Sequence, residues 1–228
     1  MTGLAKPFFA LVCCLATASA LAAGLVDISA SDATGGIREA LGKGAASAVS
    51  SLGKENGFLG NAKVRIALPD SLKSADKALR LMGQGKYTDE LIEAMNRAAE
   101  ASVAEAKPIL LESIKKMSVV DAKNILMGGQ DSVTQYFRRT STEPLTQKFR
   151  PIVRKFTQKV KLGEQYNKFA GKVASLGLID KKDADLDSYV TQKSLDGLFL
   201  MIAEQEKELR ANPLGAASAL LKKVFGAI

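Results

Sequence analysis

Serine and lysine recur at a spacing that, in some hydrolases, lets a lysine amine activate a serine hydroxyl. The pattern Ser-x-x-Lys occurs at Ser51/Lys54, Ser74/Lys77 and Ser113/Lys116. The companion motifs S-D-N and K-T-G are absent. Because a chain rich in both residue types produces such pairs by chance, they give only weak support for an enzyme.

Three aspartates in the stretch DKKDADLDS have the alternate spacing with which a calcium-binding loop begins. Asp183, Asp185 and Asp187 would take the first, third and fifth positions. The sixth position needs glycine and is Ser188, and the twelfth needs glutamate and is Ser194. We therefore predict no metal site, and expect a solvated loop in which Asp187 caps the following helix.

A glycine pair, Gly128 and Gly129, precedes a predicted helix and could present backbone N–H groups to an anion. The pair lacks the G-x-x-x-x-G-K-[ST] arrangement of a phosphate-binding loop. Such a pair more often ends one helix and turns the chain into the next. We expect that structural role, with Gly128 in the left-handed conformation.

The residue types that carry much of enzyme chemistry are missing from the expected mature chain. The sequence contains no histidine and no tryptophan, and both cysteines, Cys13 and Cys14, lie in an N-terminal leader. Their absence excludes Ser-His-Asp and Cys-His catalysis, disulfides, and imidazole or thiolate metal sites. We predict no cofactor and no metal, and we favour a binding module over an enzyme.

Basic residues concentrate in one part of the chain. Between Arg138 and Lys172 there are ten basic and two acidic residues, a net charge of +8, which equals the charge of the whole chain. One interpretation is a surface for an anionic partner. The other is internal pairing with acidic stretches such as 180–187 and 204–208. The sequence leaves both interpretations open.

The segment DSVTQYFRRTSTEPL places two arginines beside an aromatic pair. On a helix beginning near Ser132, we expect one face to be core: Val133, Tyr136, Phe137 and Thr140. The opposite face is polar: Gln135, Arg138, Arg139 and Thr142. Guanidinium groups bind phosphate or carboxylate in two-point fashion. Our candidate anion-binding residues are therefore Arg138 and Arg139, together with Gln135, Lys155 and Lys159.

Helices must position nearly all of these residues. Caps and apolar periodicity predict helices over 31–53, 70–83, 88–117 with a kink near Pro108, 118–128, 132–140, 143–160, 164–176, 188–211 and 215–227. Ser118 and Asp121 have the spacing of a capping box. Alternating Val64, Ile66 and Leu68 predict a short extended segment near residues 62–68 that presses apolar side chains onto helices.

Two of these helices have a clear apolar face. In the first it comprises Leu145, Phe149, Ile152, Val153, Phe156 and Val160, and in the second Leu195, Leu198, Phe199 and Ile202. Glu204, Glu206 and Glu208 are expected to face solvent at least in part. The loops are short, so we predict an all-α, compact multi-helix bundle. It would form a single helical domain over residues 31–228, after a flexible tail at 23–30.

The N-terminus has the features of a cleavable secretory signal peptide over residues 1–22. One lysine precedes an apolar run, and small residues stand at the A-x-A spacing for cleavage after Ala20 or Ala22. We expect a periplasmic protein; a lipoprotein processed at Cys13 or Cys14 is the alternative. No later stretch is long and apolar enough to span a bilayer.

Several ordered blocks carry a resemblance to a known family. DAKNILMGGQDSVTQYFRRTSTEPL, FRPIV, YNKFAGK, YVTQKSLDGLFLMIAEQEKELRANP and LLKKVFG are similar to the bacterial family known as domain of unknown function 4197. The resemblance extends from about Asp27 to the C-terminus. It implies an exported helical protein of Gram-negative envelopes, and it implies no activity, cofactor or catalytic residue.

These observations favour a non-enzymatic, envelope-associated binding module with a basic face. Its partner would be an anionic lipid head group, lipopolysaccharide or an acidic protein, and export makes nucleic acid an unexpected partner. The alternative is a helical carrier that encloses an apolar ligand such as a lipid. The alanine-rich helix and the many Phe, Leu and Ile residues suggest this second function.

Overall fold

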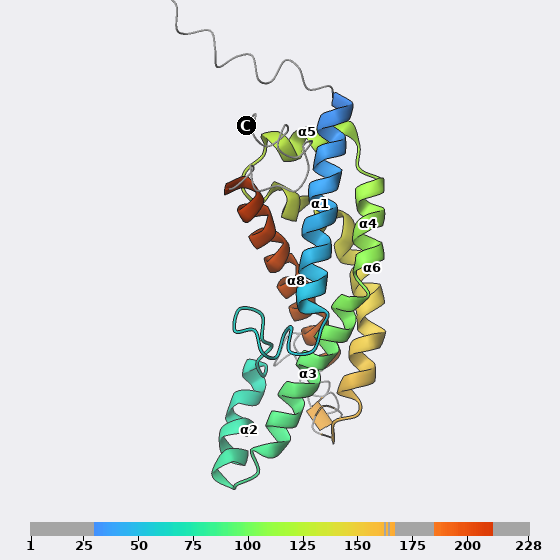
Figure 1. Ribbon diagram of the computed structural model, residues 1–228. Helices are drawn as coiled ribbons and strands as arrows, with labels where there is room; N and C mark the ends of the chain where they lie inside the picture. The colour runs from blue at the N-terminus through green and yellow to red at the C-terminus, as the bar shows by residue number, and fades with distance from the viewer. Residues whose placement is uncertain (1–29, 162, 164, 167–184, 212–228) are drawn as a thin grey trace, which may run out of the picture.

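The described part of the chain consists of α-helices that pack on one another, and it contains no strand. The computed structural model describes residues 30–161, 163, 165–166 and 185–211 (Figure 1). Helix α8 (Leu186–Ala211) packs against α1 (Ala30–Leu52), α3 (Lys86–Ala104) and α6 (Ser132–Thr157). The predicted all-α bundle is confirmed.

The segment between α1 and α2 lies outside any sheet, and residues 62–64 of the extended stretch predicted near 62–68 form a turn. Val64, Ile66 and Leu68 are all buried, while the residues between them are exposed. The buried side-chain amide of Asn96 in α3 makes the hydrogen bonds to Ile66 that a neighbouring strand would make in a sheet. Its Oδ1 accepts a hydrogen bond from the Ile66 N–H at 2.9 Å, and its Nδ2 donates to the Ile66 carbonyl at 2.9 Å. The backbone of Ile66 is thereby satisfied without a β partner.

Helices α2 (Asp70–Leu81) and α3 form a hairpin whose turn lies at the lower end of the molecule in Figure 1. Gly83 has φ of 70°, the left-handed conformation that favours glycine, so the predicted stop of α2 is confirmed. Helix α2 packs along α3, and α3 in turn packs against α6 and α8. The α2–α3 turn therefore lies beyond the main body of the bundle.

The predicted long helix over 88–117 is wrong, because the chain breaks before Pro108 instead of bending there. Helix α3 ends at Ala104, and α4 (Lys107–Lys115) begins with Pro108 in its first turn. Proline is favoured in a first turn, where its missing N–H would have no helical partner. Glu105 and Ala106 close the end of α3 with tight bonds to the Ser102 and Val103 carbonyls.

Helix α5 (Val119–Met127) begins with the predicted capping box: Asp121 N–H donates to the Ser118 hydroxyl, and Ser118 N–H donates to the Asp121 carboxylate. The left-handed conformation predicted for Gly128 is wrong, because its φ is −83°. Glycine is needed at position 128 because there is no room for a side chain. A Cβ would lie 2.6 Å from the Asn124 carbonyl oxygen and 2.6 Å from the Ser132 side chain.

The two helices predicted over 132–140 and 143–160 form one continuous helix, α6, which contains Pro144 and Pro151. Each proline removes the N–H that would bond a carbonyl one turn earlier. Both prolines are exposed, so solvent can satisfy those carbonyls. The predicted break at residues 141–142 is therefore wrong, whereas Pro144 and Pro151 lie within a helix, as the predicted helix over 143–160 placed them.

The core follows the predicted apolar faces. Leu145, Phe149 and Val153 of α6 are fully buried. In α8, Leu198 is fully buried and Phe199 is 1% exposed. Ile152, Phe156 and Val160 are half-buried. Phe58, from the segment after α1, packs so closely on α8 that a Cβ at Gly197 would lie 2.7 Å from its ring.

Several predictions fall outside the described residues: the signal peptide over 1–22, most of the tail over 23–30, most of the helix over 164–176, and the helix over 215–227. Within the part that is described, no helix is both long and apolar enough to cross a membrane.

Candidate functional site

The two arginines that open the basic segment lie on the exposed face of α6, as predicted, but acidic side chains engage both. Arg139 forms an ion pair with Asp121 of α5 at 2.7 Å and lies over the Tyr136 ring. Arg138 lies 3.9 Å from Asp196 of α8 and 4.7 Å from the centre of the Phe199 ring. Both guanidinium groups therefore contribute to packing between α6 and its neighbours.

The aromatic pair belongs to the core. Tyr136 is 4% exposed and Phe137 is fully buried, and their rings meet edge to face at 5.8 Å. Gln135 is exposed, and its side-chain amide donates to Asp131 at 3.1 Å. The N-terminal half of α6 thus combines a buried aromatic face with a polar face whose charges are already paired.

The middle of α6 also pairs its cations. Lys148 lies 3.3 Å from Glu105, which precedes α4, and Arg150 lies 2.9 Å from Asp185, which precedes α8. The second of these pairs involves the acidic stretch over 180–187. For these residues, the interpretation of internal charge pairing is correct.

The C-terminal end of α6 is different. We define the basic end of α6 as four exposed cations: Arg154, Lys155, Lys159 and Lys161. None of them forms an ion pair with any residue in the described ranges. Lys159 lies over the half-buried Phe156 ring at 5.7 Å. Cations are favoured near the C-terminal end of a helix because the last carbonyls carry partial negative charge.

The candidate anion-binding residues thus fall into two groups. Lys155 lies about 24 Å along the helix axis from Arg139, at about 1.5 Å per residue. The structure therefore places Lys155 and Lys159 together and separates them from Gln135, Arg138 and Arg139. Arg154 and Lys161 lie in the same part of the chain as Lys155 and Lys159. They are basic residues that the sequence-based prediction of anion-binding residues did not include.

A groove between α4, α5 and α6 has a volume of about 550 Å³ and is open to solvent. Its lining includes Ile109, Ser113 and Tyr136. The Tyr136 hydroxyl donates to the Ser113 carbonyl at 2.6 Å, and burial raises the pKa of Tyr136. At its rim, hydrogen bonds from Ser118 lower the pKa of Asp121, and Arg139 lowers it further.

The groove does not assemble the serine–lysine pair that the sequence suggested. The Ser113 hydroxyl lies 2.8 Å from the Ser141 hydroxyl and donates to the Ile109 carbonyl, whereas Lys116 pairs with Glu112. The Ser51 hydroxyl donates to its own helix at the Ala48 carbonyl. Because no lysine amine contacts these hydroxyls, the arrangement does not support nucleophilic catalysis.

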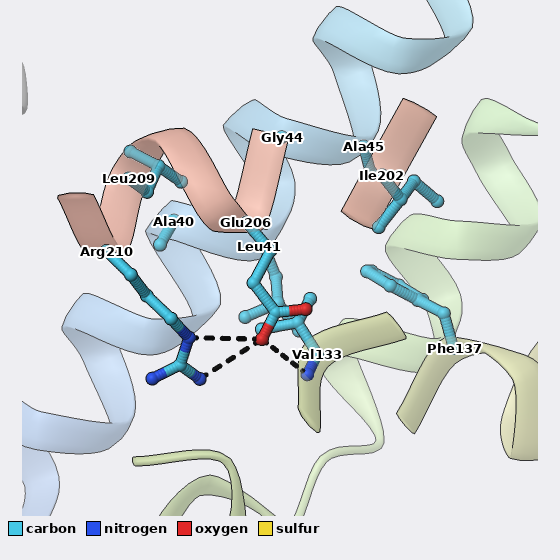
Figure 2. Close-up of a pocket in the computed structure, with 10 residues that line it drawn as sticks. All are labelled: Ala40, Leu41, Gly44, Ala45, Val133, Phe137, Ile202, Glu206, Leu209 and Arg210. Atoms are coloured by element: carbon cyan, nitrogen blue, oxygen red, sulfur yellow. Dashed lines mark hydrogen bonds and ion pairs between the residues drawn. The ribbon is translucent and has the colours of Figure 1, made fainter. Parts of the chain in front are cut away.

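A small pocket between α1, α6 and α8 is lined by apolar side chains around one carboxylate (Figure 2). Its volume is about 20 Å³, which leaves room for little more than one water molecule. Glu206 points into it and is 4% exposed, so the expectation that this glutamate faces solvent is wrong. Glu204 is half-exposed and Glu208 is exposed.

Glu206 is buried because it caps α6 from another helix. Its carboxylate accepts hydrogen bonds from the Val133 N–H at 3.0 Å and the Thr134 N–H at 3.1 Å, and Arg210 pairs with it at 3.1 Å. Glu206 stands four residues after the buried Ile202, so it continues the apolar face of α8. That periodicity is the signal by which the sequence could have revealed its burial.

The aspartates with calcium-like spacing have structural partners. Asp185, rather than Asp187, caps α8: it accepts from the Asp187 N–H at 3.1 Å and from the Ser188 hydroxyl. Asp187 is buried and accepts a short hydrogen bond of 2.5 Å from Thr157. The role predicted for Asp187 is therefore wrong, and Asp183 lies outside the described residues. Where the structure is described, no three metal-ligating side chains gather.

Comparison with protein families decides the relationship suggested by the sequence blocks. The family described as "Protein of unknown function (DUF4197)" matches residues 27–226. The chain belongs to this family. No significant match is found among curated proteins or among solved structures. For this DUF4197 chain, only its own residues indicate a role for the basic end of α6 and for the groove beside Tyr136.

Proposed function

We propose that this DUF4197 protein is a non-enzymatic binding module of the bacterial envelope that holds an anionic surface on the basic end of α6. One observation carries the proposal: Arg154, Lys155, Lys159 and Lys161 are exposed and form no ion pair within the described ranges. The segment 148–161 contains six basic residues and no acidic one. Two of these six, Lys148 and Arg150, pair with carboxylates, and the remaining four form a cluster that attracts anions.

The proposed partner is a surface that carries phosphate groups, either a phospholipid head-group layer or lipopolysaccharide. Export by the N-terminal signal peptide, which is part of the proposal, would bring the protein to such surfaces. Each lysine or arginine near an anionic membrane contributes about 1 kcal/mol, so four together support reversible binding. The attraction is strongest at low salt, because the screening length shrinks to about 8 Å at about 0.15 M.

The packing gives no support to the alternative of a lipid carrier. Phe58, Phe137 and Phe149 are fully buried and occupy the space between the helices. The apolar pocket in Figure 2, at about 20 Å³, is too small for an acyl chain, and the larger groove between α4, α5 and α6 is open to solvent and does not enclose a ligand between the helices. We therefore do not propose the carrier function.

The test is a binding measurement with two variants of equal net charge. In the first, the four cations of the basic end are replaced: Arg154→Gln, Lys155→Gln, Lys159→Gln and Lys161→Gln. In the control, four exposed lysines elsewhere on α4, α5 and α8 are replaced: Lys107→Gln, Lys115→Gln, Lys123→Gln and Lys207→Gln. The probes are phosphatidylglycerol-containing vesicles, lipopolysaccharide, and inorganic polyphosphate, a polyanion without an apolar part.

We expect the first variant to lose at least about tenfold in affinity for the polyanions, and the control to lose much less. Circular dichroism on the same samples checks that both remain folded, since surface charges contribute little to stability. Equal losses in the two variants would mean that net charge alone matters, and would contradict a localised site. Binding of an acidic protein without binding to any phosphate probe would point to a different partner.

A further inference from the structure

The turn between α2 and α3 exposes three large apolar side chains close together in the sequence. Leu81 is 90% exposed, Met82 is 63% exposed and Tyr87 is 49% exposed. We call these three residues the apolar tip. They lie at the lower extremity of the molecule in Figure 1, where α2 turns into α3.

The exposure of the tip follows from the geometry of α2. Leu72 packs against the core and Leu79 is half-buried, so one side of α2 faces the bundle. Leu81 follows Leu79 by two residues and therefore points to the opposite side. Gly83 then reverses the chain with φ of 70°, which leaves Met82 at the corner. Nothing in the described structure covers these side chains.

The acidic groups of the hairpin around the tip are all compensated. Asp76 and Asp89 both pair with Arg80, at 2.8 and 2.5 Å. Asp70 pairs with Lys73 at 2.6 Å, and Glu90 with Lys86 at 3.7 Å. The stretch 70–90 has four acidic and four basic residues. The tip can therefore approach a negatively charged surface without electrostatic repulsion.

The apolar tip and the basic end of α6 lie at the same end of the molecule. Helix α6 runs down the bundle beside α3 and finishes on the side where α3 begins (Figure 1). A hydrogen bond of 3.0 Å between the hydroxyls of Ser71 and Tyr166 joins the chain that follows α6 to the start of α2, one helix length of about 15 Å from the tip. An apolar element and a cluster of exposed cations thus share one end.

We propose that the α2–α3 turn inserts Leu81 and Met82 into the head-group region of an anionic lipid bilayer, while the basic end of α6 contacts the lipid phosphates. This inference rests on the proposed function and names a bilayer as the surface. Durable attachment of a protein to a lipid surface takes an apolar contribution as well as charge, and the two features supply both. The aromatic ring of Tyr87 suits the interface between head groups and water.

The absence of tryptophan from the chain provides a direct test. Leu81→Trp introduces a single indole at the tip, and Val120→Trp introduces one at a matched exposed position on α5, where Val120 is 67% exposed. Vesicles of phosphatidylcholine and phosphatidylglycerol are added to each protein. We expect the emission of Leu81→Trp to shift to shorter wavelength and to be quenched by brominated lipid. Val120→Trp should show neither effect.

A second pair of variants tests the contribution of the tip to affinity. Leu81→Ser with Met82→Ser removes the apolar side chains, and Val119→Ser with Val120→Ser is the control on α5. We expect vesicle co-sedimentation to weaken at least about tenfold for the tip variant and to be unchanged for the control. Binding of inorganic polyphosphate should be the same in both, because that probe offers no apolar phase.

The outcomes separate this inference from the proposed function. If the tip variant binds vesicles as well as the wild type does, or the indole at position 81 stays in water, tip insertion is wrong while the charge-based function stands. Polyphosphate binding by the wild-type protein without vesicle binding would likewise contradict insertion and leave the basic end of α6 as an anion site. If neither probe is bound by the wild-type protein, both proposals fail.

Discussion

At the scale of single residues, Glu206 has a structural role: it caps the N-terminus of α6, which has no side-chain cap of its own. Asp131 stands at the N-cap of α6 but makes no side-chain cap. The N–H groups of Val133 and Thr134 instead bond to Glu206. Arg210 compensates its charge. The buried carboxylate thus has hydrogen bonds and a counter-charge, the conditions under which a buried charge is tolerated.

Replacing this carboxylate should destabilise the fold strongly. Glu206→Ala leaves Arg210 without its counter-charge and two N–H groups unsatisfied, so we expect a loss of about 3 to 5 kcal/mol in the free energy of unfolding. Glu208→Ala, at an exposed position on the same helix, should change it by under about 0.5 kcal/mol. Urea denaturation of both variants measures the difference. Similar values for the two would show that Glu206 does not cap α6.

At the scale of elements, α6 connects the core to the proposed binding face. Its apolar face fixes how the helix is rotated: Leu145, Phe149 and Val153 are fully buried. Arg154 and Lys155 follow Val153 directly and therefore emerge on the exposed faces of the last turn. The position of the basic end is thus a consequence of core packing in the preceding turns of the same helix.

Phe149 and Phe156 of this helix should differ in their contribution to stability. Phe149 is fully buried, so Phe149→Ala should cost about 3 to 5 kcal/mol through lost apolar transfer and a residual cavity. Phe156 is half-buried beside Lys159, so Phe156→Ala should cost clearly less. Thermal and chemical denaturation followed by circular dichroism would measure both. An equal cost would contradict the burial difference.

At the scale of the whole molecule, apolar periodicity predicts much of the helical layout, while contacts distant in sequence decide the rest. The faces around Phe149 and Leu198 and the extended segment at Ile66 follow from local patterns. Whether a proline breaks a helix does not, since Pro144 is exposed within α6 whereas Pro108 begins α4. Pairing of Arg139 with Asp121 likewise depends on how α5 packs beside α6.

From the same distant contacts we predict that the protein's stability is independent of calcium. Asp185 is engaged by Arg150 and by the start of α8, and Asp187 by Thr157. We expect thermal melting curves to coincide in calcium and in chelator, because these carboxylates already have partners. A large loss of stability on chelation would mean that the acidic stretch binds metal.

The capping of α6 by Glu206 also has a consequence for the order of folding. The two partners are separated by more than 70 residues, so the first turn of α6 gains its cap only when the last described helix docks. Closing so long a loop carries an entropic cost that local helix formation does not. We therefore expect helix α6 to begin forming from its interior, and its N-terminal turn, with the pocket beside it, to become ordered late in folding.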